Sequence, residues 1–246
     1  MLVYGKTPLG VPGLDEMLGG GIPTGRVVLI LGGPGTGKTV MCTQFLVTGL
    51  KMGEPGVFVS LDESKSHYYS EMEKFGWDLQ AYEDKKMFAF LDATPIRHIP
   101  GELKVGKLTI GRKEFSLLSL IEAINAAVRE IDAKRLVIDP VTALVFQYPD
   151  LVQRRTAMLD LMEALVATGA TTLLSTELRT MGVERGVQVE EYLAHGVIVL
   201  QTLRIARAFV RVLHVEKMRE TDADNQPRPY RITPKGIEVF PKEAVF

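Results

Sequence analysis

The chain has 246 residues, of which 46% are hydrophobic and 24% charged, so it can bury a core and is not a disordered or collagen-like chain. Its 29 Lys and Arg against 30 Asp and Glu give a net charge of −1, which excludes a global attraction to nucleic acid or to an anionic membrane. The length fits a single α/β domain, and we expect residues 1–246 to form one domain.

The expected compartment is the cytoplasm. Residues 1–10 lack the basic and apolar regions of a secretory signal, and apolar stretches such as Val27–Leu31 are far shorter than the roughly 20 residues that cross a bilayer. Cys42 is the single cysteine and has no disulfide partner within the chain, which suits a reducing compartment. Its position just after a glycine-rich turn predicts a small buried helix residue rather than a reactive thiol.

Short β-prone runs alternate with helical segments from residue 27 to residue 176, a pattern typical of βαβ units around a parallel sheet. The predicted strands are Val27–Leu31, Val57–Leu61, Met87–Leu91, Leu136–Asp139 and Thr171–Thr176. The predicted helices are Lys38–Met52, Ser64–Phe75, Leu117–Ile131 and Leu151–Thr168. Three further strands are predicted at Val197–Leu203, Ala208–Val215 and Tyr230–Phe240, the last with a turn at 233–236. We therefore predict an α/β fold in which helices flank a mostly parallel sheet that carries an antiparallel C-terminal extension.

The segment from Gly32 to Thr39, GGPGTGKT, matches the phosphate-binding pattern G-x-x-x-x-G-K-[ST] and has the required strand before it and helix after it. Its glycines let backbone N–H groups turn toward phosphate oxygens, and the helix N-terminus adds partial positive charge. Lys38 is expected to reach the β- and γ-phosphates of ATP, and the Thr39 hydroxyl to bind Mg²⁺. The alternative is an ordinary glycine-rich turn. The predicted nucleotide contacts in this stretch are Gly33, Pro34, Gly35, Thr36, Gly37, Lys38, Thr39 and Val40.

Two further strands end in acidic residues, at the edge of the sheet where α/β proteins bind ligands. Asp139 is the candidate for positioning the water shell of Mg²⁺, although an acid at a strand end is often a turn or helix cap. Asp62 and Glu63 could hold a water in line with the γ-phosphate and accept its proton. They could also simply begin the next helix, with Asp62 or Ser64 as its N-cap.

Together with the phosphate loop, several other segments resemble the KaiC family of RecA-like ATPases, in both sequence and order. These segments are Gly10–Pro23, Phe75–Asp78, Ile138–Leu144, Gly169–Thr172, Glu216–Arg219 and Ile232–Ile237. The resemblance covers essentially the whole chain, with one such domain where KaiC itself has two. It implies a RecA-like P-loop fold that assembles into a ring, commonly a hexamer, with ATP held between neighbouring subunits.

The resemblance also implies roles for individual residues. It makes Asp62 and Glu63 the catalytic acids, although the family usually has Glu at both positions, and it makes Asp139 the acid that holds the Mg²⁺ water shell. Because the Asp62 side chain is one methylene shorter, it lies farther from the attacking water, and Glu63 is expected to contribute more to catalysis. Glu177 falls where the family senses the γ-phosphate.

A basic pair near the C-terminus falls where the family reaches the phosphates of the neighbouring subunit. Lys217 and Arg219 hold these positions, with Met218 and Thr221 also near the nucleotide. The two cations are two residues apart on a predicted strand, so both are expected to point the same way, where they can neutralise phosphoryl oxygens. The alternative for a Lys-x-Arg pair is a solvated charged strand face.

Three departures from the family pattern bear on activity rather than on binding. Glu191 and Tyr192 stand where the second KaiC domain has its autophosphorylated Ser-Thr pair, so self-phosphorylation of that kind is not expected. Pro140 stands where the family often has Ser, which removes a hydroxyl and an N–H group near the site. Ala223 replaces a His that approaches the nucleotide in KaiC.

The segment from Arg97 to Lys113 holds five basic residues against Glu102 alone, a local net charge of +4 in a neutral protein, and its apolar residues around Gly106 predict a small hairpin. It could bind an acidic partner or single-stranded nucleic acid, but it lacks the aromatic side chains that stack on bases, which favours a solvated insertion. The leading hypothesis is a ring-forming, Mg²⁺-dependent ATPase of regulatory or signalling function. The alternatives are an ATP-binding assembly module with slow hydrolysis and, against the neutral charge, a recombinase-like ATPase that binds DNA.

Overall fold

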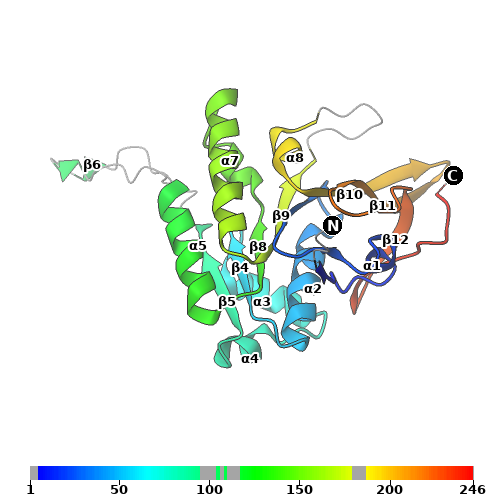
Figure 1. Ribbon diagram of the computed structural model, residues 1–246, viewed down its shortest axis with the longest axis horizontal. Coiled ribbons are helices and arrows are strands. Elements are labelled where there is room, and N and C mark those ends of the chain that lie inside the picture. Colours follow the sequence, from blue (N-terminus) through cyan, green and yellow to red (C-terminus); the bar gives the residue numbers. More distant parts are fainter. Residues whose placement is uncertain (1–4, 95–103, 106–107, 110–116, 179–186, 246) are drawn as a thin grey trace.

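The computed structural model describes residues 5–94, 104–105, 108–109, 117–178 and 187–245, which include one large sheet flanked by helices (Figure 1). Six neighbouring strands of this sheet run parallel, in the order β10 (Gly196–Ile205), β3 (Val27–Gly32), β9 (Thr171–Glu177), β8 (Arg135–Asp139), β4 (Gly56–Ser60) and β5 (Phe88–Asp92). Beyond β10 the sheet continues antiparallel through β11 (Ala208–Met218), β12 (Arg228–Thr233) and β13 (Gly236–Val239). The predicted parallel sheet with an antiparallel C-terminal extension is confirmed.

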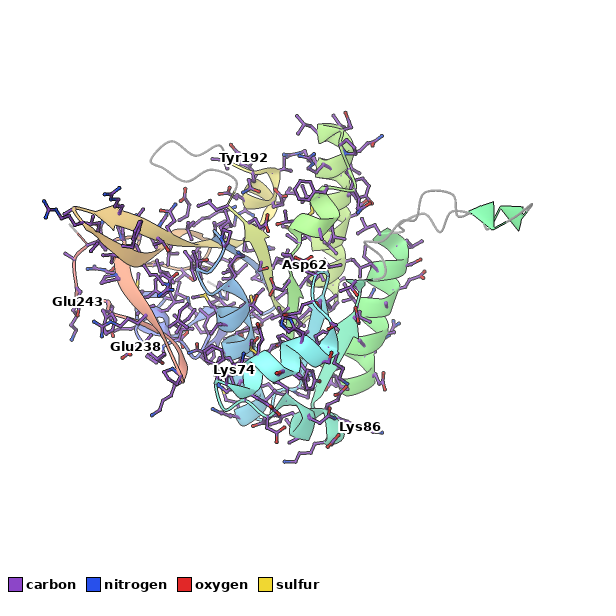
Figure 2. All side chains as sticks on the ribbon, turned by 180° about the vertical axis from the view of Figure 1, so that it is seen from behind. Asp62, Lys74, Lys86, Tyr192, Glu238 and Glu243 are labelled. Atoms are coloured by element: carbon purple, nitrogen blue, oxygen red, sulfur yellow. The ribbon has the colours of Figure 1, made fainter. Side chains whose placement is uncertain are left out.

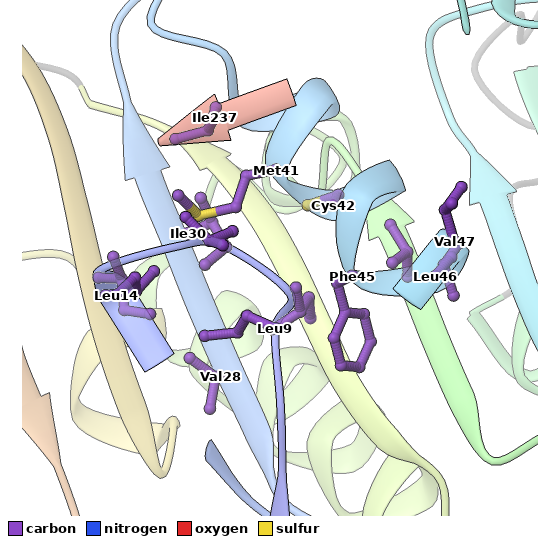
Figure 3. Close-up of a cluster of buried hydrophobic side chains, with 14 of the residues drawn as sticks. Leu9, Leu14, Val28, Ile30, Met41, Cys42, Phe45, Leu46, Val47 and Ile237 are labelled. Atoms are coloured by element: carbon purple, nitrogen blue, oxygen red, sulfur yellow. The ribbon is translucent and has the colours of Figure 1, made fainter. Parts of the chain in front are cut away.

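Helices cover both faces of the sheet and define two hydrophobic cores. One core is shared with α2 (Lys38–Lys51), α3 (Lys65–Glu73) and α4 (Leu79–Asp84), and the other with α5 (Leu117–Ile131) and α7 (Leu151–Ala167). Strand β3 serves both cores because alternate side chains of a strand point to opposite faces. Val28 and Ile30 enter the first core, where Figure 3 shows Ile30 beside Met41 of α2 and Val28 further along the strand near Leu9. Leu29 and Leu31 enter the second core.

The elements predicted from hydrophobic patterning agree with the structure to within a few residues at their ends. Helix α5 has the predicted bounds, and β12 and β13 form the two halves of the predicted final hairpin. The short elements were not predicted. They are β1 (Lys6–Thr7), α1 (Leu14–Met17), β2 (Ile22–Pro23), α4, α6 (Thr142–Val145) and α8 (Val189–Leu193).

A fully buried arginine ties the N-terminal segment to the sheet. Arg135 at the start of β8 has no exposed surface. Its Nη1 donates to the carbonyl oxygens of Pro8 at 2.7 Å and Phe45 at 2.8 Å, and its Nε donates to Glu54 Oε2 at 2.7 Å. The guanidinium also lies 4.7 Å from the centre of the Phe45 ring. One cation thus holds the N-terminal segment, α2 and the loop that follows α2 against β8.

The C-terminal hairpin packs against the glycine-rich loop and the helix that follows it. The Tyr230 hydroxyl of β12 donates to the carbonyl oxygen of Thr36 at 2.6 Å. The Gln44 amide bonds Ile237 of β13 twice, donating to its carbonyl oxygen at 3.1 Å and accepting from its N–H at 2.7 Å. Residues nearly two hundred positions apart therefore fix the shape of this loop.

Three other predictions concern the single cysteine, the basic segment around Gly106 and membrane-spanning helices. Cys42 is fully buried on α2, as expected, and burial raises the pKa of its thiol well above the usual value. The predicted hairpin around Gly106 is present as β6 (Lys104–Val105) paired antiparallel with β7 (Leu108–Thr109), whereas Arg97, Glu102, Arg112 and Lys113 lie outside the described residues. Over the parts of the chain that the structure describes, no helix is both long and apolar enough to cross a membrane.

Candidate nucleotide site

The glycine-rich loop joins the end of β3 to the first turn of α2. Gly37 has a φ of 92°, a left-handed conformation that favours glycine, and a Cβ added there would lie 2.9 Å from Ile232 Cδ1. The Thr36 hydroxyl donates to the carbonyl oxygen of Gly33 at 2.8 Å, and Lys38 Nζ donates to the same oxygen at 3.2 Å. The loop therefore folds around the Lys38 ammonium group at the N-terminus of a 14-residue helix, where backbone N–H groups are available to phosphate oxygens.

A buried carboxylate lies beside this first turn. Asp139, at the end of β8, is 7% exposed and accepts hydrogen bonds from the hydroxyls of Ser175 on β9 and Thr39 on α2. Burial raises the pKa of Asp139, and the bonds from Ser175 and Thr39 and the charge of Lys38 oppose that rise. A carboxylate and a hydroxyl in contact are hard oxygen donors, so Thr39 and Asp139 fit the ligand chemistry of Mg²⁺.

The second acidic position follows β4 and precedes α3. The Ser60 hydroxyl donates to the carbonyl oxygen of Glu63 at 2.6 Å and accepts from its N–H at 3.0 Å, which fixes the turn. Ser64 is the N-cap of α3, but its side chain makes no capping hydrogen bond within the described stretch 5–94. The Glu63 carboxylate instead contacts His67 Nδ1, and His67 Nε2 lies 3.7 Å from Glu71 Oε1. Burial raises the pKa of Glu63, as does the charge of Glu71, while His67 lowers it.

These groups open into one cavity of about 490 Å³ at the carboxyl edge of the parallel strands. It is lined by six of the residues predicted from the sequence: Lys38, Thr39, Asp62, Glu63, Asp139 and Glu177. Glu177 reaches it because it pairs with Gly32 at the end of β9, and its N–H donates to the Thr142 hydroxyl at 2.9 Å. Figure 2 places Asp62 beside α3, away from the C-terminal strands that carry Glu238.

The predicted basic pair lies at the opposite end of the parallel strands from the phosphate loop, level with the start of β3. Met218 on β11 pairs with Gly196, which pairs with Val28 near the start of β3, whereas Leu200 pairs with Gly32 at the phosphate loop. Four residues at about 3.3 Å each separate the two positions by about 13 Å along the strands. The structure therefore does not bring the basic pair to the phosphate loop of the same chain.

The two cations differ in their surroundings, which corrects the expectation that both lie on one strand. Lys217 is on β11, and its Nζ donates to carbonyl oxygens at the end of α8, to Ala194 at 2.6 Å and Glu191 at 3.0 Å. Arg219 lies in the turn after the strand, which ends at Met218, so the alternation of side chains along a strand does not apply to it. The Thr221 hydroxyl, also past the strand, accepts from Lys6 Nζ on β1.

Three residues of the site were missed in the sequence. His67 follows Glu63 by four residues, a helical spacing that would have identified it. Ser175 bonds Asp139 from the neighbouring strand, and Tyr230 bonds the phosphate loop from the C-terminal hairpin. The last two contacts depend on strand order and packing, and no local pattern signals them.

The strand order, the loop and the buried acid define a P-loop protein of the RecA-like class. The family model described as "ATPase: KaiC" matches residues 7–244, and the chain belongs to the KaiC family. It is 40% identical over 247 residues to a UPF0273 protein of Pyrococcus horikoshii, covering 98% of this chain and 96% of that relative. It is 33% identical over 242 residues to the circadian clock protein KaiC3 of Synechocystis, covering 98% of this chain and 46% of that protein. A solved KaiC-like protein of Pyrococcus horikoshii has a TM-score of 0.82 at 35% identity, covering 97% of this chain and 100% of that one.

Proposed function

We propose that this protein binds ATP with Mg²⁺ and hydrolyses it, as a single-domain member of a ring. The observation that carries the proposal is the cavity that holds the phosphate-loop lysine, a buried carboxylate bonded to the loop threonine, and a further carboxylate in the turn after the neighbouring strand β4. Membership of the KaiC family of ATPases supports it.

Five side chains of the cavity have distinct parts in the proposed reaction. Loop N–H groups and Lys38 bind the phosphates, and Thr39 and Asp139 hold Mg²⁺, which when bound neutralises charge on the phosphate oxygens. Glu63, assisted by Asp62, orients a water in line with the γ-phosphate and accepts its proton. The raised pKa of Glu63 makes its carboxylate a stronger base than that of an exposed glutamate.

The negative charge that remains on the phosphate oxygens is neutralised in trans, by Arg219 and Lys217 of a neighbouring subunit. Their position at the end of the strands opposite the phosphate loop supports this, because a head-to-tail contact between copies brings these unlike ends together. Repeated contacts of this kind form a ring when the rotation between copies closes. Met218 and Thr221 lie at the same end, beside the neighbour's nucleotide. An arginine supplied in trans typically adds about 10³ to 10⁵ in rate, so an isolated subunit is nearly inactive.

The biological role is regulatory or signalling, a proposal supported by relatives that are named circadian clock proteins. Clock-style autophosphorylation is not part of it. At the two corresponding positions, Glu191 uses its carboxylate to accept the N–H of Gln188 at 2.9 Å, and Tyr192 is exposed.

A mixing experiment tests the trans site. Glu63→Gln and Arg219→Ala chains are each expected to form rings and to release almost no phosphate. Mixed in equal amounts before Mg-ATP is added, they are expected to recover about a quarter of wild-type turnover, because one interface in four pairs an intact Glu63 with an intact Arg219. Light scattering confirms that mixed rings form. Mixed rings without recovered turnover would refute the trans assignment.

The rival function is an ATP-binding assembly module with slow or vestigial hydrolysis, and the shorter acid at Asp62 favours it. The discriminating measurement is steady-state phosphate release by the purified ring. A wild-type rate equal to that of Glu63→Gln would favour the binding module, and a rate at least about 10-fold higher supports the ATPase.

A further inference from the structure

His67 stands between two carboxylates at the mouth of the cavity. Its Nδ1 contacts Glu63 and its Nε2 faces Glu71, and one donor atom from each of the three residues lies within 4.8 Å of the others. The residues are four apart in sequence, so they follow one face of α3 and of the turn before it. The imidazole lines the cavity and is itself largely exposed, whereas the Glu63 side chain is only 25% exposed.

We propose that His67 is a positioning residue, which holds the Glu63 carboxylate toward the cavity while Glu71 fixes the other side of the imidazole ring. This inference rests on the proposed hydrolysis, in which Glu63 accepts the proton of water. A glutamate side chain has several rotamers and loses entropy when held in one. A base oriented by a second group, which is oriented in turn by a third, recurs in enzymes that activate a nucleophile.

The neighbours of Glu63 act on its protonation in opposite directions. Burial, the charge of Glu71 on α3 and the charge of Asp139 on β8 all raise its pKa. The charge of His67 and its hydrogen bond lower that pKa, so they favour the ionised form that a base needs. The other charged side chains that line the cavity are Lys38, Asp62 and Glu177.

The proposal is tested by the pH dependence of ATP hydrolysis by the full chain with Mg²⁺. His67→Ala is expected to lower kcat about 10-fold, with KM changed less than about 2-fold because His67 acts through Glu63 and not on the nucleotide. The acid limb of the kcat profile is expected to move to higher pH, because an effect that lowers the pKa of Glu63 is lost. Glu71→Gln is expected to move it to lower pH, because a like charge is lost. His67→Gln, which keeps a hydrogen-bond donor, is expected to recover part of kcat.

His214→Ala is the matched control, because it breaks a His–Glu pair on β11, in which His214 Nε2 lies 3.0 Å from Glu216 Oε2. It is expected to leave kcat and the acid limb unchanged. An active wild type whose His67→Ala variant keeps both its kcat and its acid limb overturns the positioning role. A lowered kcat with an unmoved acid limb also overturns the positioning role, because such a result indicates a change in folding or packing and not in the Glu63 carboxylate.

A second readout does not depend on turnover. The Nδ1 nitrogen resonance of His67 is expected to shift in Glu63→Gln, because the anionic acceptor is lost, while the resonances of His214 stay in place. An unmoved His67 resonance overturns the proposal. A wild type that hydrolyses ATP no faster than Glu63→Gln refutes the proposed function instead, so the two failures are distinguishable.

Discussion

Replacing Lys217 with Met is expected to destabilise the isolated, nucleotide-free subunit. The Lys217 ammonium donates to three carbonyl oxygens at the C-terminal end of α8, to Ala194 at 2.6 Å, Glu191 at 3.0 Å and Tyr192 at 3.2 Å. Lys217 is half-buried, and this burial and the charge of Arg219 lower the pKa of its ammonium group. Bonds from a charged donor contribute about 1.5–3 kcal/mol when buried, and screening by water reduces the expected total here to about 1–2 kcal/mol.

The assay is thermal unfolding followed by circular dichroism. In a chain of this size each kcal/mol moves Tm by about 2–4 °C, so Lys217→Met is expected to lower Tm by about 2–8 °C. Arg219→Met is the control, because it replaces an exposed side chain two residues away and keeps the backbone bond from the Arg219 N–H to the His195 carbonyl oxygen. An unchanged Tm in Lys217→Met would show that the ammonium does not hold α8 in the free subunit.

Three other changes have outcomes that follow from the fold. Tyr230→Phe removes the hydroxyl that donates to the Thr36 carbonyl oxygen. It should lower the free energy of unfolding in urea by about 1–2 kcal/mol and weaken ATP binding several-fold. Tyr69→Phe is the control, because the Tyr69 hydroxyl bonds Glu83, and it should leave ATP affinity unchanged. Arg135→Met should lower the free energy of unfolding by about 3–5 kcal/mol, and a loss below about 1 kcal/mol would contradict the account of its buried bonds. Folding raises the pKa of Asp139, so its ionised form opposes folding above that pKa. Asp139→Asn should therefore raise the free energy of unfolding at pH 7, and this gain should fade as pH falls through the folded pKa. The same substitution should abolish Mg²⁺-dependent binding. Lower stability of Asp139→Asn at pH 7 would contradict this interpretation.

Hydrophobic patterning predicts the long helices and strands because the burial of their apolar side chains determines where they form. Strand β3 is apolar on both faces, which is typical of a parallel strand between two layers, and α5 presents a regular apolar stripe. Helix α8 and the N-terminal elements are too short to show a period. Their positions depend on distant partners such as Lys217 and Arg135, which the sequence separates from them by many residues.

The residues of the candidate site likewise divide into those that the sequence predicts and those that only the tertiary structure reveals. Gly37 and Lys38 are predictable because the loop chemistry demands particular residue types at fixed spacing next to a strand and a helix. Asp139 is predictable because it ends a buried strand, at the edge of the sheet where α/β proteins bind ligands. The expectation for Arg219 is wrong in its local geometry, because β11 ends one residue earlier than two-residue alternation requires. The partner of Lys217 is set by where α8 packs, which depends on tertiary structure.

The contacts between the C-terminal hairpin and the phosphate loop bear on the order in which the protein acquires its site during synthesis. Thr36 and Tyr230, whose hydrogen bond fixes the loop, are 194 residues apart. The loop and α2 leave the ribosome long before this partner exists, and the Gln44 amide likewise waits for Ile237. The nascent chain therefore carries a complete phosphate-binding motif in an unfinished shape, and bound nucleotide stabilises the fold fully only after the last strands have docked.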